Sequence, residues 1–105
     1  MIILGIDPGS RRIGYGLIEK NRGKLKFLRA GLLRISPGDN FSALRETKKQ
    51  IELFLDLEEP GIVAVEKLYF SRNQKTGLEV AQSRGVIMAA AIEKNLDIYE
   101  FSPSE

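Results

Sequence analysis

The chain has 105 residues, of which 43% are hydrophobic and 29% charged, a balance typical of one globular domain and not of a disordered chain. It contains no cysteine and no histidine, which excludes disulfides, thiolate chemistry and imidazole ligands and leaves carboxylates and lysines for catalysis. No apolar run approaches the roughly 20 residues of a membrane span. Met1 leads straight into an apolar segment without a signal peptide, so we expect a cytoplasmic protein with no membrane association.

The net charge of +2 is unevenly distributed along the chain. Between Arg11 and Arg34 there are eight basic residues and a single acid, Glu19. Such a block is typical of a stripe that faces nucleic-acid phosphates. It is equally typical of the solvated edge of a sheet, where basic side chains prevent aggregation. The sequence favours neither interpretation.

The first part of the chain predicts three strands. Residues 2–7 form an apolar run typical of a strand buried on both faces. Pro8-Gly9 then takes the chain out of the sheet. Residues 13–20 and 24–35 are predicted to form two further strands, joined by a hairpin turn at residues 21–23.

The second part predicts two helices alternating with two strands. A helix is predicted over residues 41–57, after several candidate capping residues, and a buried strand over residues 62–65. A Thr-x-x-Glu capping box at residues 76–79 predicts the start of a second helix, which runs to about Asn95. Residues 97–101 form the last strand. The resulting order, strand-strand-strand-helix-strand-helix-strand, predicts an α/β domain with a mixed five-stranded sheet and flanking helices.

Two acids end short apolar strands at matching positions. Asp7 ends the first strand, and Glu66 follows the strand at residues 62–65. If these strands are parallel neighbours, both carboxylates emerge at the same edge of the sheet, where α/β folds place their sites. Two clustered acids need a shared cation, and without His or Cys ligands we expect Mg²⁺ or Mn²⁺. The alternative is an ordinary pair of solvated strand ends.

Several motifs, in order along the chain, resemble the RuvC family of Holliday-junction resolvases. The family's amino-terminal motif is similar to "IILGIDPGSRRIGYGLIE" in this chain. Its second acidic motif is similar to "VAVEKLYFSRN". The family's next helix is similar to "GLEVAQSRGVIMAAA", and the strand and helix start after it are similar to "YEFSPSE". The resemblance covers essentially the whole chain and implies that residues 1–105 form a single ribonuclease H-like domain.

The resemblance implies an endonuclease that resolves four-way DNA junctions by metal-dependent phosphodiester hydrolysis in recombination and repair. It implies that Asp7 and Glu66 are catalytic acids that hold Mg²⁺, with Mn²⁺ as an alternative. It also implies a homodimer and a branch-migration complex as partners. A dimer agrees with the helix that begins at residue 76, which has two apolar faces and therefore predicts packing on the sheet and on something else.

The resemblance also points to DNA contacts beside the two acids. Tyr69 stands where the family typically has a phenylalanine that reaches into the junction, so we expect it to stack on a base. Packing in the core is the alternative for Tyr69, and ordinary solvated loops are the alternative for its polar neighbours. The candidate phosphate contacts are Ser10, Arg11, Arg72, Asn73 and Lys75.

Two further interpretations stay open. The resemblance places the family's last acidic motif beyond Glu105, so we expect this chain to bind metal weakly and to be inactive alone. A non-catalytic DNA-binding or dimerisation module of the same fold is therefore one alternative. The remoter alternative is a fragment of an actin-like or Hsp70-like ATPase, whose first phosphate loop also resembles "GIDPGS". Those ATPases need two such domains and a second phosphate loop.

Overall fold

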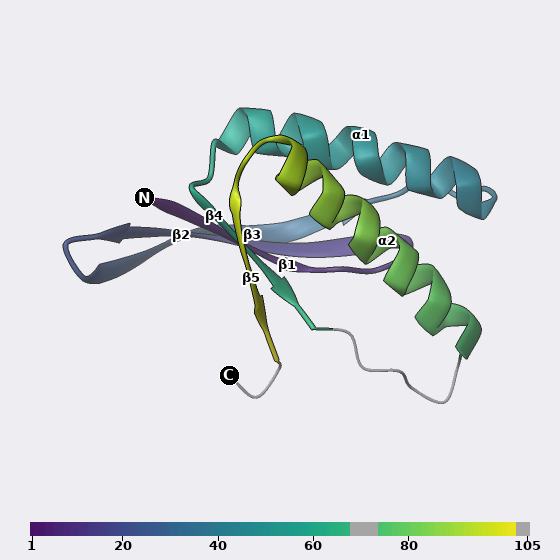
Figure 1. The fold of residues 1–105 in the computed structure, drawn as a ribbon, viewed down its shortest axis with the longest axis horizontal. Coiled ribbons are helices and arrows are strands. Elements are labelled where there is room, and N and C mark those ends of the chain that lie inside the picture. The colour runs from purple at the N-terminus through teal and green to yellow at the C-terminus, as the bar shows by residue number, and fades with distance from the viewer. Residues whose placement is uncertain (68–73, 103–105) are drawn as a thin grey trace.

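The computed structural model describes residues 1–67 and 74–102, apart from the side chains of residues 74 and 75. Its elements follow one another in the predicted order (Figure 1), and their bounds agree with the prediction to within a few residues. They are β1 (Ile2–Asp7), β2 (Arg12–Asn21), β3 (Lys24–Arg34), α1 (Asn40–Glu58), β4 (Ile62–Glu66), α2 (Gln74–Glu93) and β5 (Asp97–Phe101).

The strands form one mixed sheet in the order β3-β2-β1-β4-β5. The central strand β1 is antiparallel to β2 and parallel to β4, and β5 extends the parallel half. The predicted hairpin joins β2 and β3, and its turn residues Arg22 and Gly23 both have positive φ, as a tight two-residue turn requires. One extra residue in β3, Leu28, forms a bulge opposite Leu17 and Ile18 and shifts the register of the pairs beyond it.

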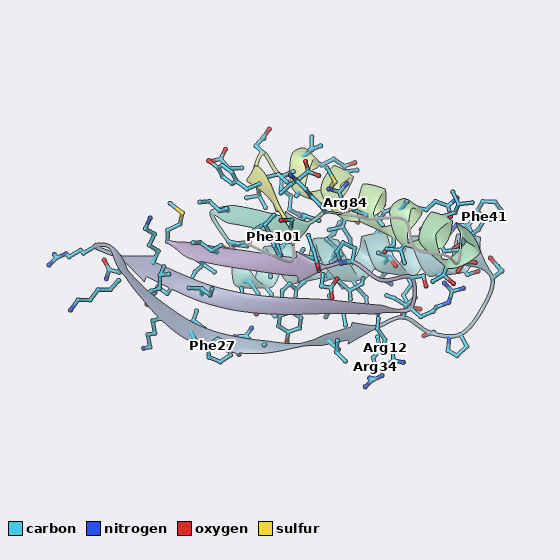
Figure 2. The ribbon with its side chains drawn as sticks, turned by 90° about the horizontal axis from the view of Figure 1, so that it is seen from below. Arg12, Phe27, Arg34, Phe41, Arg84 and Phe101 are labelled. Atoms are coloured by element: carbon cyan, nitrogen blue, oxygen red, sulfur yellow. The ribbon has the colours of Figure 1, made fainter. Side chains whose placement is uncertain are left out.

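Both helices pack on the same face of the sheet, and Figure 2 shows the strands in front of them. Side chains at alternate strand positions point toward the helices and form the core. The opposite face carries the intervening residues, among them Ile3, Gly5 and Asp7 of β1, and no element of the described chain covers it. The largest core side chains are Leu4, Ile6, Ile13, Leu17, Val63 and Val65 from the strands and Ile51, Leu55 and Ile87 from the helices.

The helix starts differ in how well the sequence predicts them. Asp39 caps α1, because its Oδ1 accepts a hydrogen bond from the N–H of Ser42 at 2.9 Å, within the predicted capping segment. The predicted start of α2 is wrong, since α2 begins at Gln74 and Thr76 already lies inside its first turn. Threonine and glutamate with this spacing can occur inside the first turn of a helix as well as at its N-cap. The pattern alone therefore does not determine the residue at which the helix begins. Within the described segments, neither helix is long and apolar enough to cross a bilayer.

Candidate active site

Asp7 and Glu66 end two neighbouring parallel strands. β1 and β4 pair in register up to Ile6 and Val65, so the next residue of each strand emerges beside the other at the carboxyl edge of the sheet. Alternation along each strand turns both acids to the face that the helices leave uncovered. Asp7 is exposed, and Glu66 is half-buried. The structure therefore confirms that these two strands are parallel neighbours.

The two carboxyl groups interact directly. A hydrogen bond with Asp7, partial burial and the negative charge of Asp7 together raise the pKa of Glu66 above its ordinary value of 4.5. The hydrogen bond with Asp7 is the largest of these causes. Two carboxylates that share a site resist ionising together. The pair is therefore suited to hold a proton or, when both groups are ionised, a cation.

The loop after Asp7 is fixed by α2 and by its own tight backbone. Ser83 is a buried residue of α2, and its Oγ donates a hydrogen bond to the carbonyl oxygen of Gly9 at 2.8 Å. Any side chain at Gly9 would overlap the carbonyl oxygen of Arg12, so this position requires glycine. These two contacts determine how the chain leaves β1 and so hold the Asp7 carboxylate in place.

Arg84 of α2 fixes the backbone that carries Glu66. Its Nε donates to the carbonyl oxygen of Glu66 at 3.2 Å, and its guanidinium forms an ion pair with Glu100 of β5. The ladder between β4 and β5 continues beyond Glu66, because the N–H of Lys67 donates to the carbonyl oxygen of Phe101 at 2.7 Å. Glu66 is therefore anchored from the helix layer and from the neighbouring strand.

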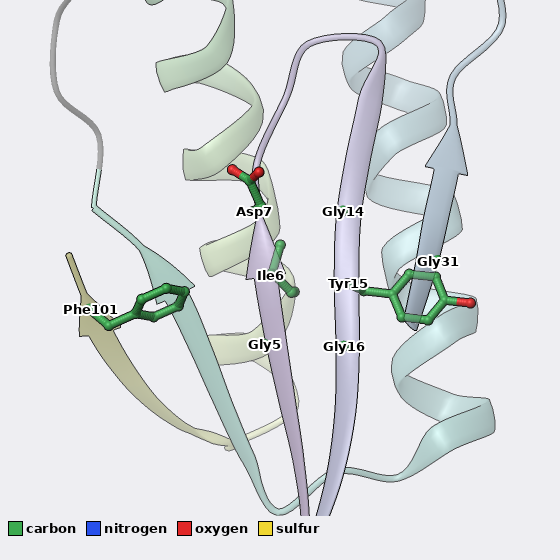
Figure 3. Close-up of a pocket in the computed structure, with 8 residues that line it drawn as sticks. All are labelled: Gly5, Ile6, Asp7, Gly14, Tyr15, Gly16, Gly31 and Phe101. Atoms are coloured by element: carbon green, nitrogen blue, oxygen red, sulfur yellow. The ribbon is translucent and has the colours of Figure 1, made fainter. Parts of the chain in front are cut away.

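A shallow hollow of about 350 Å³ opens beside Asp7 (Figure 3). Figure 3 shows the ring of Phe101 turned from β5 toward β1, where it forms one wall of the hollow. Gly14 of β2 faces Asp7, and a Cβ atom at this glycine would lie 3.4 Å from the Asp7 Cβ, so glycine leaves room beside the carboxylate. Sequence reasoning missed Phe101, because no local pattern shows which strand it contacts. The sequence favours a packing and helix-contact role for Arg84 over a ligand role, and only the structure shows that Arg84 contacts the Glu66 carbonyl.

The donor set fits a hard divalent ion. Asp7 and Glu66 offer carboxylate oxygens only, which are the ligands that Mg²⁺ and Mn²⁺ prefer. Within the part of the chain that the structure describes, no group of three or more potential ligand residues gathers. Asp97 begins β5 at the opposite edge of the sheet, and Glu100 is engaged by Arg84. The described residues thus offer two carboxyl groups at this edge of the sheet that could hold a cation.

The other predicted site residues fall into two groups. Ser10 and Arg11 lie in the loop after Asp7, where Ser10 is half-buried. The guanidinium of Arg11 donates to the carbonyl oxygens of Ser10 and Gly38, each at 3.1 Å, and so ties this loop to the segment before α1. The predicted DNA contacts that lie outside the described residues are Tyr69, Arg72, Asn73 and the side chain of Lys75.

A family model described as crossover junction endodeoxyribonuclease RuvC matches residues 3–105. The protein of that name from Caldicellulosiruptor saccharolyticus is 38% identical over 110 residues, which covers 98% of this chain and 63% of the relative. The one from Natranaerobius thermophilus is 39% identical over 104 residues, covering 98% and 65%. The chain therefore spans less than two thirds of the length of these relatives.

A solved structure shares this fold. The structure described as T. thermophilus RuvC in complex with Holliday junction substrate has a TM-score of 0.83 and 25% sequence identity, over 99% of this chain and 66% of that one. This likeness and the mixed five-stranded sheet confirm the ribonuclease H-like α/β fold. The sequence, the fold and the family match agree: the chain belongs to the RuvC family of crossover junction endodeoxyribonucleases.

Proposed function

We propose that this chain binds four-way DNA junctions and supplies two of the acids with which a RuvC-type endonuclease cuts them. The observation that carries the proposal is the position of Asp7 and Glu66 at adjacent parallel strand ends on the uncovered face of the sheet, where Asp7 raises the pKa of Glu66. The relatives described above are named as crossover junction endodeoxyribonucleases, and the T. thermophilus protein is in complex with a Holliday junction substrate.

In this proposal Asp7 and Glu66 hold a divalent ion, Mg²⁺ or Mn²⁺, in place of the shared proton. Such an ion supplies the activation of water and the stabilisation of the leaving oxygen in phosphodiester hydrolysis. The protein would contribute by holding the two strand ends that carry these acids side by side. Ser83 and Arg84 contribute by anchoring the backbone on either side of the pair.

The DNA contacts of this proposal follow from the family motifs. Tyr69 and the polar residues after it lie in the segment that matches the family's second acidic motif, and Ser10 lies three residues after Asp7. Arg11 uses two of its five guanidinium N–H donors on backbone carbonyls, which leaves the others for a phosphate. The proposed direct contacts are Ser10, Arg11, Tyr69, Arg72, Asn73 and Lys75.

A non-catalytic DNA-binding module is the second candidate function, and one observation favours it. Asp7 and Glu66 have no third acid beside them in the described part of the chain, whereas two-metal sites commonly use further carboxylates. We therefore expect the 105-residue chain to bind a junction without nicking it.

The test separates binding from cleavage. Fluorescence anisotropy compares the affinity of the chain for a synthetic four-way junction and for a linear duplex, and a gel assay with Mg²⁺ or Mn²⁺ detects nicking. A chimera can be made by joining residues 1–105 to the segment of a relative that this chain does not match. We expect this chimera to nick the junction. Asp7→Asn should abolish nicking by the chimera and preserve its affinity for the junction, since phosphate contacts supply most of that affinity.

Asp97→Asn is the matched control, because it removes the same charge at the opposite edge of the sheet. Nicking that survives Asp7→Asn would contradict the assignment of the acid pair. A chimera that prefers junctions but never nicks them would instead establish the non-catalytic alternative.

We also propose that α2 forms the interface of a homodimer. One side of α2 packs on the core and on α1, yet Leu78 and Ile92 on another side are 59% and 61% exposed. Gly85 lies midway between them, so the three residues form one stripe at heptad spacing. A Cβ atom at Gly85 would meet nothing within 4 Å, so the chain itself does not require glycine there, whereas close packing of a second helix would. A two-fold dimer also suits a four-way junction, which needs two symmetry-related cuts.

Sedimentation velocity tests this interface. The wild-type chain should sediment as a dimer, and Leu78→Glu/Ile92→Glu as a folded monomer with an unchanged circular dichroism spectrum. Leu57→Glu is the control, since Leu57 is 77% exposed on α1, away from the proposed interface. A wild-type monomer at high micromolar concentration would refute the interface.

A further inference from the structure

Arg12 of β2 and Arg34 of β3 stand directly opposite each other in the sheet. The next residues form a hydrogen bond, because the N–H of Ile35 donates to the carbonyl oxygen of Arg11 at 2.9 Å. The arginine pair therefore occupies a position between hydrogen-bonded pairs, where cross-strand side chains come closest. Figure 2 shows both arginines together at the β3 edge of the sheet.

The fold places these two like-charged residues opposite each other. The register set at the hairpin turn would place Leu33 opposite Arg12, and the bulge at Leu28 shifts the register by one residue and brings Arg34 there instead. Like charges directly opposite each other destabilise a sheet. Among the described residues, no ion pair offsets the charge of either arginine.

The backbones of the two arginines are fixed, while their side chains are exposed. Gln50 of α1 donates from its Nε2 to the carbonyl oxygen of Arg34 at 2.9 Å. The carbonyl of Arg12 lies against Gly9, where only glycine fits. Arg29, another arginine of the same hairpin, is by contrast engaged by Glu58 of α1. Two arginine side chains that start from directly opposite backbone positions, and that have no counter-charge among the described residues, can together bind one anion.

The arginine pair lies on the same face and at the same edge of the sheet as the acid pair. Gly14 pairs with Asp7 and shares a strand face with Arg12, two residues away. From strand rise and strand spacing, the two arginine Cα atoms lie about 8–12 Å from the Cα of Asp7. Gly14 has no side chain, and its partner Leu32 of β3 is the described strand residue that lies between the two pairs on this face.

We propose that Arg12 and Arg34 together bind one backbone phosphate of a DNA strand whose scissile phosphodiester lies at Asp7 and Glu66, a few nucleotides away. Successive phosphates of one strand are separated by more than the axial rise of about 3.4 Å per nucleotide, so the bound phosphate lies at most about four nucleotides from the scissile one. Planar guanidinium groups bind phosphate oxygens through paired hydrogen bonds, so the contact positions the strand without reading its sequence. This inference rests on the proposed function, because it takes DNA as the ligand.

The experiment is a double-mutant cycle between the arginines and individual phosphates. Single methylphosphonate substitutions remove the charge of one phosphate at a time in a synthetic four-way junction, and anisotropy measures the affinity of each. The wild-type chain should lose about tenfold in affinity at one or two positions near the scissile phosphate, and Arg12→Gln/Arg34→Gln should show no loss there. The same variant should lower the slope of log affinity against log salt by about 1.

Lys20→Gln/Lys24→Gln is the matched control. It removes two charges from the same two strands at the hairpin tip, which extends beyond the rest of the sheet in Figure 1, about 27 Å along β2 from Arg12. This control should keep the wild-type sensitivity at the affected phosphates. If the arginine variant and the wild type respond alike at every phosphate, the pair only protects the edge of the sheet and the inference is overturned.

The same scan on a linear duplex distinguishes this inference from the proposed function. A wild-type chain that binds duplex as tightly as junction would contradict junction specificity, yet a position-specific loss that disappears in Arg12→Gln/Arg34→Gln would still support the phosphate contact. A chain that binds no DNA at all would overturn both.

Discussion

Asp7→Asn should stabilise this protein at neutral pH even though it removes a proposed catalytic acid. The hydrogen bond and charge of Asp7, with partial burial, raise the pKa of Glu66. Asparagine removes the charge, and its side-chain N–H can donate a hydrogen bond to an ionised Glu66. Two unit charges about 4 Å apart repel each other by about 1 kcal/mol in bulk water, and the exposure of Asp7 keeps the pair near this limit. We expect the free energy of unfolding to rise by up to about 1 kcal/mol, which corresponds to about 4–8 °C in Tm.

The raised pKa of Glu66 makes the free energy of unfolding depend on pH, and the direction of this dependence follows from proton binding. Between the ordinary value of 4.5 and the raised pKa of Glu66, the folded wild-type chain binds more protons than the unfolded chain. The contribution of Glu66 to stability is therefore fully present at low pH and is lost as the pH rises through this window. The difference between wild type and Asp7→Asn should become small well below pH 4.5, where Glu66 is protonated in both the folded and the unfolded chain.

Thermal unfolding followed by circular dichroism across this pH range measures the effect, and carboxyl NMR titration follows Glu66 directly. Asp97→Asn serves as the control, because it removes an exposed acid at the far edge of the sheet. The reasoning would be refuted if Asp7→Asn lowered Tm at neutral pH, or if Glu66 titrated identically in the wild type and the variant.

Three further predictions concern the surroundings of the site and the alternative function. Gly9→Ala should lower Tm and return the pKa of Glu66 toward its ordinary value, because the added Cβ displaces the loop next to Asp7. An unchanged titration of Glu66 would contradict this prediction. Thr47→Val should raise the free energy of unfolding by about 1 kcal/mol in urea titrations, since the buried hydroxyl of Thr47 has no hydrogen-bond partner among the described residues. Calorimetry with ATP and Mg²⁺ should show no binding, and measurable nucleotide binding would revive the ATPase alternative.

The sequence by itself determines the elements of this fold and the two acids at their ends. Apolar runs that stop at Asp7 and Glu66 predict both strands and both candidate ligands, because burial and strand formation depend on local hydrophobic pattern. The tight turn at Arg22 and Gly23 is equally local, since it depends on the backbone conformations that these two residues can adopt. Family motifs around the same residues point to the function.

Only the tertiary structure decides which of these residues meet. The contact of Asp7 with Glu66 needs β1 and β4 to pair in parallel, and the contact of Arg84 with the Glu66 carbonyl needs α2 to pack across β4. The pairing of Arg12 with Arg34 depends on a single bulged residue in β3. Each contact joins residues far apart in the chain, so it is set by strand register and core packing, which no local pattern of residues encodes.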